Sequence, residues 1–119
     1  MTNSQGRKYD LEERTSKFGE NIIKFCRELP KNDITKPIIN QLIRCGTSVG
    51  ANYCEADDAE SKADFRHKIG ICKKESRETK YFLRMIVTAE TSITDSARIL
   101  WTEAKELNLI FNSIYKQLK

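Results

Sequence analysis

The chain contains little of what most enzymes and secreted proteins are built on. Its 119 residues include one histidine, His67, so no two-histidine metal site can form within one chain. The segment GTSVGAN at residues 46–52 lacks the Gly-Lys-Ser/Thr ending of a phosphate-binding loop. No apolar run approaches the roughly 20 residues of a membrane-spanning helix, and residues 1–8 lack the apolar centre of a signal peptide. We therefore expect a cytoplasmic, non-enzymatic protein without cofactor or metal.

Closely spaced cysteines are also missing. The four cysteines, Cys26, Cys45, Cys54 and Cys72, form no Cys-x-x-Cys pair, whereas zinc sites gather their ligands at short spacing. Thiols in the cytoplasm are kept reduced. We expect buried or half-buried thiols, with a redox role or a metal site as the less favoured alternatives.

Glycine and proline are scarce, with five and two residues, and no useful strand alternation occurs. Apolar residues instead recur in the four-then-three step of amphipathic helices. The first predicted helix follows Asp10 as N-cap and ends at Pro30. A polar connection over residues 31–36 precedes a second helix that has Pro37 in its first turn. The seams of these two helices are Leu11, Phe18, Ile22, Phe25 and Leu29, then Ile38, Leu42, Cys45, Val49 and Ala56.

Two further helices fill the second half of the chain. Ser61, with Asp64 three residues later, predicts the start of a helix that runs to about Glu90. Thr91 or Thr94 opens the fourth helix. Its seam has the clearest period of the four: Ile93, Ala97, Leu100, Ala104, Leu107, Phe111, Ile114 and Leu118. The fold class predicted is all-α, an antiparallel up-down four-helix bundle formed by one domain over residues 9–119, after a disordered N-terminus at 1–8.

The second and fourth helices carry more apolar residues than one core seam needs. In a four-helix monomer no helix is surrounded, so such a broad apolar band favours a homo-oligomer over scattered surface hydrophobics. The candidate oligomer or packing residues are Ile39, Ile43, Asn52, Tyr53, Trp101 and Ile110.

Small and polar residues interrupt the second helix. Gly46 and Gly50 each cost about 1 kcal/mol relative to alanine inside a helix, so we expect close approach of a neighbouring helix, or alternatively a helix break or kink at these glycines. Asn52 occupies a seam position, where a buried amide needs a partner and can specify the oligomeric state. Ser76 and Thr79 of the third helix are the predicted partners of Asn52.

Positive charge is concentrated in the second half of the chain. Residues 1–60 carry nine basic and ten acidic side chains, against twelve and seven in residues 61–119. On the third helix, basic residues three, four or seven apart share one face, which follows the buried seam by one position. The interpretations are a solvated face or a phosphate-binding surface. The candidate nucleic-acid-binding residues are Lys62, Arg66, Lys68, Lys73, Lys74, Arg77, Lys80 and Arg84.

Two features limit this surface. The sequence predicts no aromatic platform for base stacking, so binding should depend on backbone charge and be weakly sequence-specific. The acidic turn from Glu55 to Glu60 adjoins the start of the stripe, and it lacks the spacing of an EF-hand calcium loop. We expect it to be solvated. Glu75 and Glu78 should offset part of the repulsion among the cations.

The segment from Gly46 to Glu78, with Leu42 and Arg44 before it and Tyr81 after it, resembles the four-helix-bundle family encoded by intervening sequences in bacterial 23S rRNA genes. That family is related to the accessory variability proteins of diversity-generating retroelements. The resemblance implies a homopentamer and contact with RNA or DNA, and, through the retroelement relatives, a reverse-transcriptase partner. A structural or protein-interaction scaffold without nucleic-acid binding is the alternative.

Overall fold

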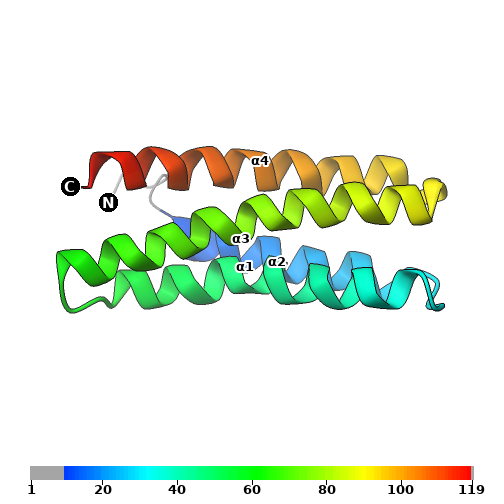
Figure 1. Ribbon diagram of the computed structural model, residues 1–119, viewed down its shortest axis with the longest axis horizontal. Helices are drawn as coiled ribbons and strands as arrows, with labels where there is room; N and C mark the ends of the chain where they lie inside the picture. Colours follow the sequence, from blue (N-terminus) through cyan, green and yellow to red (C-terminus); the bar gives the residue numbers. More distant parts are fainter. Residues whose placement is uncertain (1–9, 119) are drawn as a thin grey trace.

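The computed structural model describes residues 10–118, and within that range the chain forms four α-helices and no strand. They are α1 (Leu11–Arg27), α2 (Thr35–Asp57), α3 (Lys62–Ala89) and α4 (Thr94–Gln117), with a short 3-10 helix, η1 (Thr91–Ile93), before α4. Successive helices run in opposite directions along a rod of 44 × 24 × 20 Å (Figure 1). The predicted all-α, four-helix fold is confirmed. The predicted disorder at residues 1–8 lies outside the described residues.

Most helix boundaries follow the local signals in the sequence. The Ser61 hydroxyl accepts a hydrogen bond from the backbone N–H of Asp64 at 3.0 Å, as predicted. Asp10 does occupy the N-cap position of α1, but its side chain makes no capping bond. Both predicted starts of the fourth helix are in use, because Thr91 begins η1 and Thr94 begins α4.

Helix α2 begins at Thr35, two residues before Pro37. Its start therefore lies within residues 31–36, which were predicted to form a connection. Asn32 explains this early start. Its Oδ1 accepts hydrogen bonds from the backbone N–H groups of Ile34 and Thr35, at 2.9 Å each. The Thr35 hydroxyl accepts from the Asn32 N–H at 3.0 Å. These bonds satisfy donors that a helix start leaves unpaired.

The core lies between the four helices and follows the predicted seams closely. In α2 four of the five predicted seam residues are buried. The exception is Ile38, which is only half-buried, whereas Ile39 is 6% exposed and belongs to the core. The expectation that Ile39 lies outside the main stripe is therefore wrong. The largest buried apolar side chains are Phe18, Ile22, Leu42, Val49, Ile69, Leu83, Ile86, Leu107 and Phe111.

Glycines allow α1 and α2 to approach closely. A Cβ on Gly46 would lie 2.9 Å from both Cγ atoms of Ile22, and one on Gly50 would lie 3.2 Å from the backbone oxygen of Thr15. The helix passes through both glycines without a break. The predicted close approach is confirmed, and the alternative of a helix break is wrong.

Each helix packs chiefly on its neighbours in the chain, while α1 and α4 meet along a much smaller contact. We describe the bundle as two hairpins, α1–α2 and α3–α4; the contact of α2 with α3, which joins them, is the largest in the bundle (Figure 1). Among the described residues, no helix is long and apolar enough to cross a membrane.

Candidate nucleic-acid interface

The predicted basic residues of α3 divide into two groups. Lys62, Lys74, Arg77 and Arg84 are exposed on the outer face of the helix, whereas Arg66, Lys68, Lys73 and Lys80 are half-buried. The four half-buried cations contact groups of the same chain. The single uniform stripe expected from the spacing is therefore not what the structure shows.

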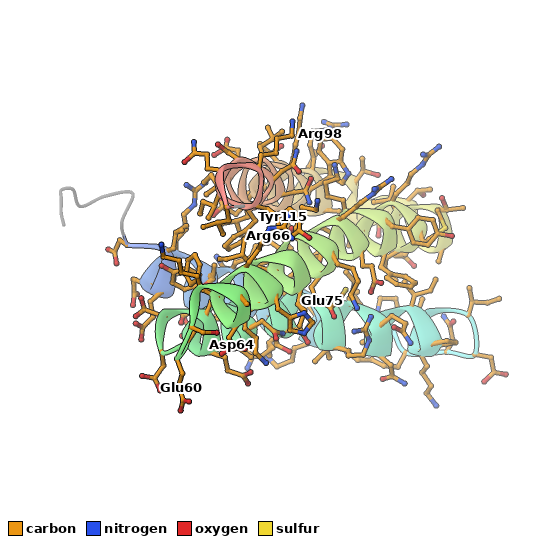
Figure 2. The ribbon with its side chains drawn as sticks, turned by 60° about the vertical axis from the view of Figure 1, so that its left-hand side comes forward. Glu60, Asp64, Arg66, Glu75, Arg98 and Tyr115 are labelled. Atoms are coloured by element: carbon orange, nitrogen blue, oxygen red, sulfur yellow. The ribbon has the colours of Figure 1, made fainter. Side chains whose placement is uncertain are left out.

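Arg66 is held against the end of α4. Its Nε donates to the backbone oxygen of Leu118 and its Nη1 to the Tyr115 hydroxyl, both at 2.9 Å. The guanidinium also lies 3.9 Å from the centroid of the Tyr115 ring, and the Lys73 Nζ lies 4.4 Å from it. Figure 2 shows Arg66 and Tyr115 side by side between α3 and α4. These cations join the helices of the second hairpin.

Lys80 and Lys68 make further contacts within the chain. The Lys80 Nζ lies 5.4 Å from the Trp101 ring centroid. The Lys68 Nζ lies 2.6 Å from a carboxylate oxygen of Glu55, and this hydrogen bond raises the pKa of Lys68. The acidic turn thus interacts with the beginning of the basic helix, as its position in the sequence suggested.

An acidic pair on α3 binds a cation from α2. Arg44 Nη1 lies 3.1 Å from Glu75 Oε1, and its Nη2 lies 2.6 Å from Glu78 Oε1. These bonds, led by the one to Glu78, raise the pKa of the Arg44 guanidinium. Glu75 is buried, at 6% exposure, and points toward α2. The two glutamates were expected to offset repulsion among the α3 cations, but their strongest contacts are with Arg44.

The exposed basic residues surround an aromatic side chain that the sequence interpretation missed. Tyr81 is 56% exposed and lies four residues after Arg77 and three before Arg84, so all three share the outer face of α3. Its ring packs edge-on against Phe82 at 5.1 Å between centroids. An exposed aromatic ring therefore lies among the basic residues of α3, although the sequence interpretation considered none there. The signal was the spacing of Tyr81 from the two arginines.

Tyr81 also lines a shallow hollow between α2 and α3, with a volume of about 660 Å³. Five of its lining residues carry side-chain donors for a phosphate or a base edge: Gln41, Arg44, Lys74, Arg77 and Tyr81. The lining residues are Gln41, Arg44, Lys74, Arg77, Glu78, Tyr81 and Phe82. Within residues 10–118, Lys62, Arg77 and Arg84 make no ion pair. The hollow thus lies beside uncompensated positive charge.

The candidate oligomer residues occupy several environments. Tyr53, Trp101 and Ile110 are half-buried against the core, and Ile43 is 36% exposed. Asn52 donates to the backbone oxygen of Ser48 on its own helix, at 2.9 Å.

The amide that does reach across to α3 belongs to Asn108, not to Asn52. The Asn108 Nδ2 donates to the backbone oxygen of Lys73 at 2.8 Å and to the Ser76 hydroxyl at 3.2 Å. The predicted bond from Asn52 to Ser76 or Thr79 is therefore wrong. The most exposed large apolar side chains lie elsewhere, at Ile99 (73%), Ile34 (66%) and Leu109 (56%).

No metal-binding cluster of three or more His, Cys, Asp or Glu side chains forms in the described part of the chain. His67 is exposed. Cys26, Cys45 and Cys72 are buried free thiols, and burial raises the pKa of Cys26 to about 11 and that of Cys72 to about 12. Cys54 is exposed, contrary to the expectation that all four thiols are at least half-buried.

The fold and the basic outer face define a class of protein: a small four-helix bundle with alternating helix directions and a cationic third helix. The model of the 23S rRNA-intervening sequence protein family matches residues 7–115. The chain belongs to this family.

A solved structure supports the same assignment. The chain is similar to a protein of unknown function from the S23 ribosomal protein family of Bacteroides thetaiotaomicron VPI-5482. The two share 29% sequence identity and a TM-score of 0.78, over 88% of this chain and 97% of the other. A search of curated proteins found no match. The relation to retroelement accessory proteins stays a prediction.

Proposed function

We propose that the chain is a non-enzymatic, cytoplasmic, oligomeric bundle protein that binds structured RNA or other nucleic acid through the outer face of α3. The observation that carries the proposal is the arrangement of Arg77, Tyr81 and Arg84. Two cations without an ion pair among the described residues flank an exposed aromatic ring. Phosphates attract the cations and any unpaired base can stack on the ring.

The half-buried cations of α3 add positive charge next to this surface. Arg66, Lys73 and Lys80 are fixed on the aromatic rings of α4, so their charge adds to the potential of the face without a need to reorganise. Backbone contacts to phosphate carry no sequence information. We therefore expect weak sequence preference and a preference for loops or single-stranded ends, whose bases are free to stack.

Charge reversal tests this surface. The variant Arg77→Glu/Arg84→Glu should weaken binding to a short RNA hairpin at least tenfold at low salt, and it should reduce the slope of log K against log salt. The matched control is Lys17→Glu/Lys24→Glu, which makes the same change of net charge at exposed positions of α1. Equal affinities of the two variants, measured by fluorescence anisotropy, would contradict the proposal.

Removal of the aromatic ring separates stacking from charge. Tyr81→Ala should weaken binding of a single-stranded oligonucleotide about tenfold, since stacking contributes about 1–3 kcal/mol per base. Tyr81→Phe keeps the ring and should bind like the parent. A blunt duplex should not distinguish the three proteins. If Tyr81→Ala weakens duplex and single strand alike, the ring has no stacking role.

The assembly proposed is a homopentamer, as the family resemblance implies. Exposed Ile99, Ile34 and Leu109 support a covering partner, because such side chains gain free energy when another surface removes them from water. Native mass spectrometry of the full chain measures the subunit number directly. A monomer at micromolar concentration would contradict this part of the proposal and leave α3 to be tested separately.

The same exposed apolar residues favour the second candidate function, a structural or protein-interaction scaffold without nucleic-acid binding. In that case a protein partner would cover Ile99 and Leu109. Salt distinguishes the two functions, because phosphate binding weakens steeply as salt rises and apolar docking does not. The reverse-transcriptase partner stays a prediction from the family relation alone.

A further inference from the structure

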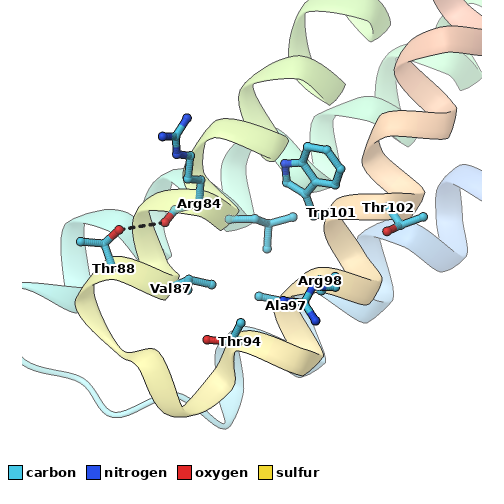
Figure 3. A pocket seen from close by; sticks show the side chains of 9 residues that line it. Arg84, Val87, Thr88, Thr94, Ala97, Arg98, Trp101 and Thr102 are labelled. Atoms are coloured by element: carbon cyan, nitrogen blue, oxygen red, sulfur yellow. Dashed lines mark hydrogen bonds between the residues drawn. The ribbon is translucent and has the colours of Figure 1, made fainter.

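A second hollow lies between the end of α3 and the beginning of α4 (Figure 3), and it shares no lining residue with the Tyr81 hollow. Its volume is about 520 Å³, which lies within the range of small-molecule sites. It is lined by Leu83, Arg84, Val87, Thr88, Thr94, Ala97, Arg98, Trp101 and Thr102.

The floor of this α3–α4 groove is apolar. Leu83 and Ala97 are 1% exposed and form its base, while Val87 and Trp101 are half-buried at its sides. Ala97 is the small side chain that leaves room here. Four residues later, Trp101 has the Nζ atoms of Lys80 and Lys105 at 5.4 and 5.6 Å from its ring centroid. The indole is thus held in place beside the groove by two cations.

The rim of the groove is positive. Arg84 of α3 and Arg98 of α4 both line the groove, and in Figure 3 the Arg84 guanidinium points outward from α3. Arg84 makes no ion pair within residues 10–118. Arg98 lies 3.7 Å from Asp95, and this pair is highly exposed, with side-chain exposures of 70% and 98%. Such a pair contributes little and leaves the guanidinium available.

The start of α4 adds to this charge. Thr94 is the first residue of the 24-residue helix and lines the groove. The positive end of the helix dipole therefore lies at the same rim as the two arginines.

We propose that the α3–α4 groove binds a small amphipathic anion. The apolar body of the ligand, an aromatic ring or an aliphatic chain of about eight to ten carbons, would lie on Leu83, Val87 and Trp101. Its single carboxylate, phosphate or sulfonate would lie between Arg84 and Arg98. Charge complementarity selects this occupant over an uncharged one, because two guanidinium groups and a helix N-terminus surround one apolar floor. The proposal does not require nucleic-acid binding, although the groove shares Arg84 with the proposed nucleic-acid surface.

Trp101 provides a direct reporter, since it is the only tryptophan in the chain. The probe is 8-anilinonaphthalene-1-sulfonate, an aromatic anion that accepts excitation energy from tryptophan. Titration of the full chain should give saturable energy transfer from Trp101 with one probe per chain. Decanoate should displace the probe at a lower concentration than 1-decanol does, because the alcohol has the same chain without the charge.

Charge reversal at the rim completes the test. Arg98→Glu alters an exposed side chain and should weaken probe binding about fivefold. The control Lys17→Glu makes the same change of net charge on α1 and should bind like the parent. A second variant, Val87→Glu, places a carboxylate beside the floor and should weaken binding further.

Three results would overturn the proposal. One is the absence of energy transfer from Trp101, as expected if another subunit covers the groove. Another is equal affinity of Arg98→Glu and Lys17→Glu. The third is displacement by decanol at the same concentration as decanoate.

Discussion

The contact between the two helices of a hairpin is built differently in α1–α2 and in α3–α4. Between α1 and α2, glycines remove side chains so that the helices nearly touch, and Gly46 leaves no space in front of Ile22. Between α3 and α4, large rings and long cations hold the helices, with Tyr115 and Trp101 as the central groups. Both hollows that we assign to ligands involve α3, and one of them lies between α3 and α4. The α1–α2 contact thus depends on the absence of side chains, and the α3–α4 contact on large ones.

The largest expected effect comes from adding a side chain between α1 and α2. Gly46→Val should destabilise the protein by about 3 kcal/mol, because its Cβ would meet Ile22, which is fully buried and cannot move aside. Urea unfolding followed by circular dichroism measures the loss.

Gly70→Ala adds a side chain between α3 and α4, for comparison. Its Cβ would lie 3.0 Å from Cε1 of the half-buried Tyr115 ring, which can shift, and alanine favours a helix by up to about 1 kcal/mol. We expect stability within about 0.5 kcal/mol of the parent. Similar losses from both substitutions would show that the two hairpins are packed equally tightly.

The contact between the hairpins should be intermediate in sensitivity. Arg44→Ala leaves the buried Glu75 without its cation from α2, and we expect a loss of about 2 kcal/mol. The double variant Arg44→Ala/Glu75→Leu removes the orphaned charge and should recover most of that loss.

Arg14 provides the control for Arg44. It pairs with Glu103 and Glu106 across the small α1–α4 contact, at 2.7 and 2.8 Å. These carboxylates are more exposed than Glu75, so Arg14→Ala should cost less than about 1 kcal/mol. Equal losses from Arg14→Ala and Arg44→Ala, measured by urea unfolding, would contradict the importance of the buried carboxylate.

Helix number and boundaries could be predicted from the sequence because their signals are local. Ser61 and Asp64 lie within one turn of each other, and Pro30 and Pro37 act on their own backbone. The choice between Ile38 and Ile39 as the first core residue of α2 could not be derived in the same way. Ile38 and Ile39 are identical residues one position apart, so spacing alone left a 100° ambiguity about which of them faces the core.

The candidate site could not be predicted without knowing which helices pack together and their relative position along the bundle axis. Asn52 and Asn108 both follow seam periodicity, but only Asn108 faces Ser76 of α3. The contacts of Arg66 with Tyr115 and Lys80 with Trp101 likewise depend on the relative height of α3 and α4. Tyr81 differs, since its position between Arg77 and Arg84 is visible in one helix alone.

The buried thiols give an effect that is confined to high pH and that involves every α-helix except α4, which contains no cysteine. Cys26 lies in α1, Cys45 in α2 and Cys72 in α3, where the Cys72 thiol donates to the backbone oxygen of Val49. Burial raises the pKa of each of these thiols in the folded protein. In the unfolded chain a thiol loses its proton near pH 8.5, as in model peptides.

Above that pH the unfolded chain binds fewer protons than the folded protein, so stability falls as pH rises. Each buried thiol should contribute a loss of up to about 1.4 kcal/mol per pH unit between pH 9 and pH 11, where Cys26 begins to ionise in the folded state. Below pH 8 the effect should vanish.

Urea unfolding at pH 8 and pH 10 of the parent, Cys72→Ala and Cys54→Ala measures this pH-dependent loss of stability. Cys72→Ala should reduce the loss between the two pH values by the share of one thiol, while Cys54→Ala, which removes an exposed thiol, should leave it unchanged. If both substitutions reduce the loss equally, burial of the thiols is not its cause.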